Sequence, residues 1–561
     1  MKTKFYASFL ILLTELVNTG IAQNANQSLS NLTSPTAINQ SLLPDINNSK
    51  DLGSASNSWR DLYLDGKIFI RDTPSIIITT AFGTNATIVG SNAGNSNTGY
   101  NNCFYGSRSG YTNTSGALNC FFGINSGYYN TTGGSNSFFG GSAGLTNTTG
   151  GANTFLGSRA GTSNISGSFN VFAGWNAGYS NTTGYSNIAI GASAMFTNNS
   201  GTHSIAIGDS ALYYTTTGNN VAIGSKALYK TISGFDNTAI GYLSLYSNTT
   251  GWNNVAAGAL ALNNNTTGYE NISVGNFSLN SNTTGGRNAA SGVYSLYYNT
   301  TASNNAAYGY SALFKNSTGS NNVAVGYSSM QNNTTGFYNT SLGYESGFLN
   351  DTGRSNTIVG AEAGYTNVSD YNCFFGNEAG YNNTTGNKNT MLGYHAGNTN
   401  TTGSSNTIIG YGADVTNATL TNSAAIGNYA TVSANNTMVL GNSSESVVIG
   451  ANAPATGYKL SVNGKIICEE LKIQLSQNWP DYVFNKNYHL IPLADLDKKI
   501  QSVHHLPNIP SADEVKKDGV SVGDMQQLMM QKIEELTLYV IQLEKQNTDL
   551  QKQVNEIKTG K

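Results

Sequence analysis

One short motif, Asn-x-x-x-Gly, constrains the fold of this chain more than any other feature. It occurs 20 times, and most motif glycines keep the spacing of Gly174, Gly191 and Gly208, with three slightly shorter steps. In two copies Ala86 and Ser204 take the place of the asparagine. A fixed period this short is typical of a solenoid, in which each repeat forms one coil stacked on the coil before it. The motif glycines are Gly90, Gly106, Gly123, Gly140, Gly157, Gly174, Gly191, Gly208, Gly224, Gly241, Gly258, Gly275, Gly292, Gly309, Gly326, Gly343, Gly360, Gly376, Gly393 and Gly410.

The composition of the repeat favours strands over helices. Each repeat is rich in glycine and asparagine, which are poor helix formers, and its apolar runs are only three or four residues long. Short strands broken by tight turns fit this pattern. We therefore predict an all-β solenoid, a parallel β-roll of about 17-residue repeats, over residues 83–450.

Two positions of the repeat vary in opposite senses. The middle residue of the three between Asn and Gly is large where the residue four after the glycine is Gly, as with Phe121 and Gly127. It is small where that residue is Leu or Met, as with Ala222 and Leu228. The rule holds in 18 of 20 coils and fails in those of Gly343 and Gly410. Because a close-packed interior keeps its volume constant, both positions should share one core.

The outer two residues of each triplet should face away from that core, because strand side chains alternate. They are nevertheless apolar in many coils, for example Val221, Ile223 and Ile240. A strand that is apolar on both faces is normally buried on both faces. Soluble monomers avoid a long exposed apolar stripe, so the pattern predicts self-association along the solenoid.

The rest of each repeat is a turn. Asn stands seven residues after the motif glycine in 18 of 20 copies, often within Asn-Thr-Thr-Gly, as at residues 181–184. Asn and Gly tolerate left-handed backbone, and stacked coils should align these asparagines into ladders. Asn-Thr-Thr is also a glycosylation sequon, which we interpret as a by-product of turn composition unless the host glycosylates.

An aromatic residue stands five after the motif glycine in 12 of 20 coils, including Tyr111, Tyr128 and Tyr213. A stacked aromatic row could bind sugars, but such rows more often serve packing, and we favour a packing ladder.

Part of the repeat resembles a known family. Residues 204–208, Ser-Ile-Ala-Ile-Gly, and 220–224, Asn-Val-Ala-Ile-Gly, look like the head repeats of YadA-type trimeric autotransporter adhesins. The resemblance implies a trimer of left-handed parallel β-rolls that binds host matrix or other surfaces. The repeat here is longer, and its Asn-Thr-Thr-Gly turn is extra. The sequence up to Lys561 lacks that family's membrane anchor, so we do not expect a self-exporting autotransporter.

The region before the repeats suggests export and capping. Residues 1–22 have the lysines, apolar run and small-residue cleavage site of a secretory signal peptide. Residues 23–82 are a polar segment and a cap, and residues 51–66 resemble a segment of trimeric phage-type tail fibres. A small capping hairpin is the alternative interpretation of that segment.

The region after the repeats should form a small mixed α/β base over residues 451–524. A hairpin is expected at residues 458–467, with Asn463 and Gly464 at its turn, and a helix at residues 492–503. Ser511 and Glu514 form a capping box at the start of another short helix. Residues 504–511 and those that follow resemble the C-terminal region of secreted bacterial tail-fibre-domain proteins. We interpret His504 and His505 as surface residues, because no partner ligand has metal-binding spacing.

The last segment, residues 525–561, has the heptad pattern of a coiled coil. β-Branched residues at a, Leu at d and one Asn favour dimers, whereas the fibre resemblance implies a trimer. We predict the trimer, because the long solenoid contact should outweigh about four heptads. The predicted oligomerisation residues are Ile533, Leu536, Val540, Leu543, Asn547, Leu550, Val554 and Ile557.

The sequence offers no chemistry of a catalytic kind. Charged residues make up 10% of the chain and the net charge is −3, so no basic face for nucleic acid is expected. No paired carboxylates, Cys/His pair or phosphate loop stands out, and the four cysteines form no CxxC pair. We expect no enzyme activity, no cofactor, no metal site and no transmembrane anchor.

These patterns predict a secreted or surface-exposed fibrous protein, adhesive or structural, that forms a homo-oligomer. Its surface ligand would be a glycan or matrix protein. The alternative is an ice- or glycan-binding extracellular solenoid, although paired threonines at turns lack the flat strand array of an ice binder.

Overall fold

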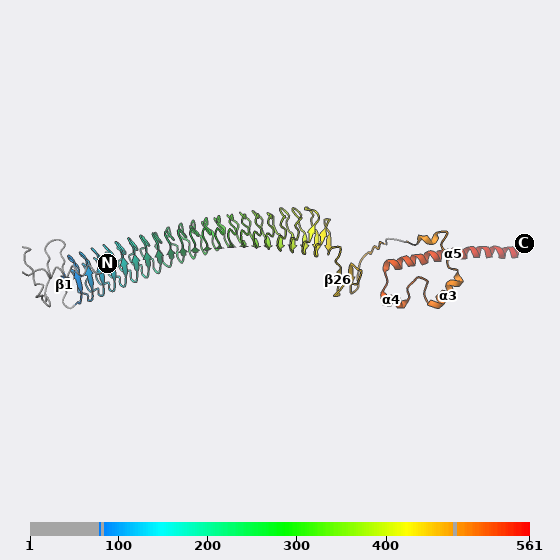
Figure 1. Cartoon of the computed structure of the whole chain (residues 1–561), viewed down its shortest axis with the longest axis horizontal. Helices are drawn as coiled ribbons and strands as arrows, with labels where there is room; N and C mark the ends of the chain where they lie inside the picture. Colours follow the sequence, from blue (N-terminus) through cyan, green and yellow to red (C-terminus); the bar gives the residue numbers. More distant parts are fainter. Residues whose placement is uncertain (1–77, 80–83, 475–478, 561) are drawn as a thin grey trace, which may run out of the picture. The chain divides into compact units, whose positions relative to one another are not determined.

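The structure is a computed structural model that describes residues 78–79, 84–474 and 479–560. The chain divides into two units, residues 1–445 and residues 446–561. The predicted signal peptide (1–22) lies outside the described residues, as does all of the predicted cap except residues 78–79. The described part of the first unit is a parallel β-solenoid with one sequence repeat per coil, which confirms the predicted fold class there (Figure 1).

The solenoid contributes one short strand per coil to a single 23-stranded sheet. β1 (Ile78–Thr79) pairs antiparallel with β2 (Thr87–Val89), and the later pairs of this sheet are parallel and in register. The strands that follow β2 are β3 (Cys103–Tyr105), β4 (Cys120–Phe122), β5 (Ser137–Phe139), β6 (Thr154–Leu156), β7 (Val171–Ala173), β8 (Ile188–Ile190), β9 (Ile205–Ile207), β10 (Val221–Ile223), β11 (Thr238–Ile240), β12 (Val255–Ala257), β13 (Ile272–Val274), β14 (Ala289–Ser291), β15 (Ala306–Tyr308), β16 (Val323–Val325), β17 (Thr340–Leu342), β18 (Thr357–Val359), β19 (Cys373–Phe375), β20 (Thr390–Leu392) and β21 (Thr407–Ile409).

Two further coils continue the sheet beyond the last motif glycine. β23 (Ala424–Ile426) and β25 (Met438–Leu440) stack in parallel on β21 and on each other. Both lie within the predicted solenoid, residues 83–450, but not among the 20 motif copies, because Ser423 stands where the asparagine should be and the last step, from Gly427 to Gly441, is shorter than the earlier ones. In these coils the turn also becomes a strand, since β22 (Asp414–Val415) pairs with β24 (Thr431–Val432).

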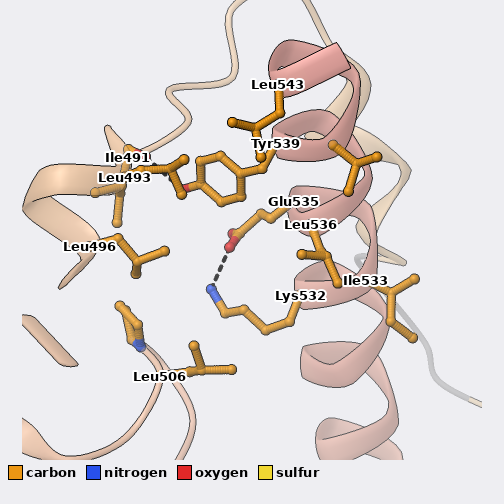
Figure 2. A pocket seen from close by; sticks show the side chains of 12 residues that line it. Ile491, Leu493, Leu496, Leu506, Lys532, Ile533, Glu535, Leu536, Tyr539 and Leu543 are labelled. Atoms are coloured by element: carbon orange, nitrogen blue, oxygen red, sulfur yellow. Dashed lines mark hydrogen bonds and ion pairs between the residues drawn. The ribbon is translucent and has the colours of Figure 1, made fainter. Parts of the chain in front are cut away.

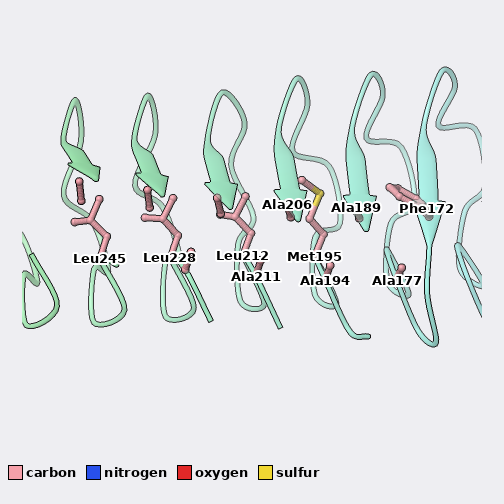
Figure 3. Close-up of a cluster of buried hydrophobic side chains, with 14 of the residues drawn as sticks. Phe172, Ala177, Ala189, Ala194, Met195, Ala206, Ala211, Leu212, Leu228 and Leu245 are labelled. Atoms are coloured by element: carbon pink, nitrogen blue, oxygen red, sulfur yellow. The ribbon is translucent and has the colours of Figure 1, made fainter. Parts of the chain in front are cut away.

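The predicted shared core is confirmed. The middle residue of each triplet from β2 to β23 is buried, whether it is Phe121 or Ala222, and so is Leu228. A Cβ added to Gly127 would lie only 2.5 Å from the Phe121 ring, so glycine makes room for the large side chain. Figure 3 shows the exchange at its boundary, where Phe172 gives way to Ala189 and Met195 fills the space.

Both exceptions to the volume rule have a structural reason. In the coil of Gly343 both positions are small, but Gly347 lies against Met330 and Ile358 of neighbouring coils, which fill the gap. In the coil of Gly410 the fourth residue is Asp414, which belongs to β22 and so no longer occupies a turn.

The motif glycines are required by backbone geometry. Gly224 has φ +132°, a conformation that L side chains rarely adopt. A Cβ at this position would lie 2.5 Å from the carbonyl oxygen of Gly241 in the next coil. The glycine therefore permits both the turn and the close stacking of successive coils.

One core position escaped the sequence analysis. The residue three after the motif glycine is Ala or Ser in every coil and is buried in most of them, as at Ala177, Ala194 and Ala211. Figure 3 shows these small side chains lining the core opposite the strands. The run of small residues is visible in the sequence. It does not covary with another position, so it was not predicted to belong to the core.

The second unit contains short strands and helical segments. β26 (Val447–Ile449) and β27 (Leu460–Val462) pair in parallel, so the predicted antiparallel hairpin at residues 458–467 is wrong. Asn463 instead donates from its backbone N–H to the Ile449 carbonyl and from Nδ2 to the Gly450 carbonyl, which continues coil-like stacking.

The described residues of this unit contain four helical segments, and the sequence predicted all of them except η1. They are η1 (Pro480–Phe484), α3 (Leu493–Val503), α4 (Ala512–Asp518) and α5 (Val522–Thr559). The predicted helix at residues 492–503 is confirmed as α3, and the predicted capping box is confirmed at Ser511 and Glu514. α5 contains all the heptad residues, whereas its pairing with other copies stays a prediction.

Candidate functional site

The outer positions of the strands form a long apolar row on the solenoid. Ile223 and Ile240 are 37% and 44% exposed, and Val221 is half-buried. Their backbones pair in register with the next coil, so each outer side chain stands directly above its equivalent. The described residues therefore leave an in-register apolar face uncovered, as the strand pattern predicted.

Aromatic side chains stack into ladders along the coils. At the position five after the motif glycine, the rings of Tyr179, Phe196 and Tyr213 stack with centroids 5.0 Å apart at each step. The predicted packing ladder is therefore present.

A second and more exposed aromatic ladder joins Tyr310, Tyr327 and Tyr344. Its rings stack with centroids 5.4 Å apart and are nearly half exposed. Because each ring face is covered by the next ring, the ladder presents ring edges and hydroxyls outward.

Two asparagine ladders run inside the coils. At the motif position, the backbone N–H of Asn136 donates to Asn119 Oδ1 at 3.0 Å, and Asn136 Nδ2 donates to the Gly150 carbonyl at 2.9 Å. At the turn position, Asn130 Nδ2 donates to Asn113 Oδ1 at 2.6 Å. These side chains are buried, and their amides form hydrogen bonds with backbone and asparagine groups that would otherwise be buried without a partner.

The turn ladder bears directly on glycosylation, because its asparagines are the sequon asparagines. Asn181 is fully buried, and its Nδ2 donates to Asn164 Oδ1 at 2.7 Å and to the Gly184 carbonyl at 3.1 Å. Nδ2 is the atom to which an N-linked glycan would be covalently attached. In the folded coil this atom is inaccessible, which agrees with the interpretation of these sequons as turn chemistry.

The threonines of the turns are also partly committed. Thr131 Oγ1 donates to the Thr148 carbonyl of the next coil at 2.9 Å, and Thr266 does the same to Thr283 at 3.0 Å. These hydroxyls stabilise coil stacking rather than facing solvent as donors. The arrangement does not favour an ice-binding surface, which needs an array of free hydroxyls.

The predicted oligomerisation residues lie along one side of α5. The seven apolar ones are 45–79% exposed, and Asn547 is exposed as well. We call this set the heptad seam: Ile533, Leu536, Val540, Leu543, Asn547, Leu550, Val554 and Ile557. No part of the chain that the structure describes covers the seam.

A polar cluster holds α5 against the rest of the base. Tyr488 donates its hydroxyl hydrogen to Glu535 Oε1, and Lys532 Nζ donates to Glu535 Oε2 at 2.8 Å. The hydroxyl of Tyr539 donates to the Ile491 carbonyl at 2.5 Å. Burial and the Glu535 contact raise the pKa of Tyr488 to about 12, so this hydroxyl stays a donor at neutral pH. Sequence reasoning missed this cluster, because its partners lie far apart along the chain.

The described residues include few reactive or metal-binding groups. Cys103 and Cys120 lie side by side in the register of β3 and β4. Burial is the main cause that raises the pKa of Cys120, and the neighbouring Cys103 thiol raises it further. His395 Nε2 lies 2.8 Å from Glu378 Oε2. Among the described residues, no group of three or more His, Cys, Asp or Glu side chains could hold a metal ion. No helix within the described ranges is long and apolar enough to span a membrane.

Comparison with known proteins adds no family. No protein-family model matches the chain, and no curated protein sequence matches it.

Proposed function

We propose that this chain is an extracellular fibrous protein that assembles side by side with copies of itself and acts in adhesion or as a structural fibre. The observation that supports this most is the exposed apolar row along the strands. It repeats in register over many coils, and covering it would remove a stripe of Ile, Val, Leu and aromatic side chains from water.

We propose a homotrimer as the assembly. The YadA-like repeats at residues 204–208 and 220–224 and the tail-fibre-like segments favour three chains. The uncovered heptad seam on α5 supplies a second, independent surface for the same copies. The predicted signal peptide at residues 1–22 supports secretion.

Glycan binding is a second candidate, and the Tyr310–Tyr327–Tyr344 ladder favours it. Its row of exposed ring edges and hydroxyls could contact an extended polysaccharide, whereas covered ring faces could not stack on sugars.

Binding of the secreted protein to immobilised matrix proteins and to a glycan array tests the ligand. We expect saturable binding to one of these surfaces, and replacing Tyr327 by Ala should reduce it only if the ligand is a glycan on this ladder. Absence of binding to every surface would leave the structural role and reject the adhesive one.

A further inference from the structure

The second unit contains an apolar groove beside the heptad seam. One wall is formed by Leu493 and Leu496 of α3 and by Leu506 and Pro507 after it. The other wall is formed by the first four seam residues of α5, and the groove has a volume of about 350 Å³. Figure 2 shows Lys532, Glu535 and Tyr539 reaching from α5 toward the α3 side between the two walls.

The groove is apolar and carries no net charge that would favour a partner of opposite sign. Its two charged side chains, Lys532 and Glu535, neutralise each other in an ion pair of 2.8 Å. Leu493 and Leu506 are nonetheless 47% and 43% exposed, and the seam residues opposite them are exposed as well. The occupant should therefore present apolar side chains and no net charge.

The groove continues into a second hollow along the same helix. Val540 and Leu543 line both, and the second hollow extends along α5 to Asn547 and Leu550. A segment that covers the seam therefore passes through the groove before it runs on along the helix. It must match a seven-residue apolar period, which is the property of a helix with its own heptad seam.

We infer that the groove receives the heptad seam of α5 from a second copy of this chain, so that each base holds the helix of its neighbour. The inference rests on the proposed side-by-side assembly. Copies joined along the solenoid bring their α5 helices to a high effective concentration, which favours this occupant over an unrelated partner. The α3 wall then adds contacts that a simple two-helix seam lacks.

Cross-linking between differently tagged chains tests the inference on the whole 561-residue chain with its four native cysteines replaced by serine. One chain carries Leu496→Cys on the α3 wall, and the co-expressed chain carries Val540→Cys on the seam. Copper–phenanthroline with oxygen as the oxidant converts the two thiols into one disulfide with loss of two hydrogens. We expect a covalent heterodimer containing both tags.

The matched control replaces Leu496→Cys by Lys498→Cys. Lys498 also lies on α3 but is 79% exposed and does not line the groove, so it should give no heterodimer. Sedimentation of the same samples separates two failures. Oligomers without the cross-link would overturn the groove assignment alone, whereas monomers would overturn the proposed assembly and the inference with it.

Discussion

The size of single residues in this solenoid is constrained by packing within the coil and against the coils on either side. Phe121 and Gly127 share one cross-section of the core, and Ala222 and Leu228 fill the same cross-section in another coil. The second solution carries a backbone cost, because Leu228 has φ +51°, which disfavours a side chain with a Cβ. The chain tolerates that cost in a series of coils, so packing outweighs local backbone preference there.

This compensation predicts a partial rescue. Phe121→Ala should destabilise the protein by ~3–5 kcal/mol, because it opens a cavity in a close-packed core. Gly127→Leu alone should also destabilise, because its side chain would collide with the Phe121 ring. The double variant should lose less unfolding free energy than the sum of the two single losses, even though the left-handed leucine costs ~1–2 kcal/mol. Urea unfolding of the four proteins measures the coupling, and simple additivity would reject a shared core.

Adjacent glycines allow a controlled test of stacking. Gly140 has φ +145°, and a Cβ there would collide with the Gly157 carbonyl oxygen, whereas a Cβ on Gly141 would meet nothing within 4 Å. Gly140→Ala should therefore lower the melting temperature strongly, through strain of ~1–3 kcal/mol. Gly141→Ala should leave it unchanged or slightly higher. Thermal unfolding followed by circular dichroism compares them, and equal effects would mean that the carbonyl contact does not limit the stacking.

At the scale of elements, the repeated coils and the helices could be predicted, whereas strand pairings and contacts outside the repeats could not. The strand triplets, turns and ladders could be predicted because every coil repeats the same residue pattern. Covariation, such as that of Phe121 with Gly127, also indicates a contact. The parallel pairing of β26 with β27 was not readable, because an Asn-Gly pair such as 463–464 normally indicates a hairpin. Tyr488 and Tyr539 form hydrogen bonds with residues far away in the sequence. No periodic pattern accompanies these contacts, so the sequence did not predict them.

The turn ladder makes a prediction about sequons, in which burial rather than motif decides modification. Asn400 is fully buried, and its Nδ2 donates to Asn383 Oδ1 at 2.8 Å and to the Gly403 carbonyl at 3.0 Å. Asn417 occupies the same repeat position in Asn-Ala-Thr but is exposed. A chain with a glycan on Asn400 could not form this rung, so the folded protein from a glycosylating secretory pathway should carry glycan on Asn417 and none on Asn400. Glycopeptide mass spectrometry decides, with Thr419→Ala as the control that removes the Asn417 sequon.

At the scale of the whole molecule, two exposed apolar surfaces are candidates for assembly, and they lie in separate units. The outer strand face belongs to the solenoid, and the heptad seam belongs to α5. The structure also shows how to separate their roles, because the groove between α3 and α5 ends near Leu543. Removing residues 546–561 should shorten the seam while leaving Gln531, Glu535 and Tyr539 in place to hold the base together.

If the solenoid sets the number of chains, deletion of residues 546–561 should weaken assembly without changing its stoichiometry, and this is the result we expect. Changing Val221, Ile223 and Ile240 together to Asp should instead dissociate the solenoid contact, because unpaired carboxylates would be buried against one another. Asp at the exposed turn positions Thr250, Thr267 and Thr284 adds the same charge away from that row and serves as the control. Analytical ultracentrifugation reads the stoichiometry of each protein. Monomers after the tail deletion would show that the seam sets the number of chains. A monodisperse monomer from the undeleted chain would reject both surfaces as interfaces.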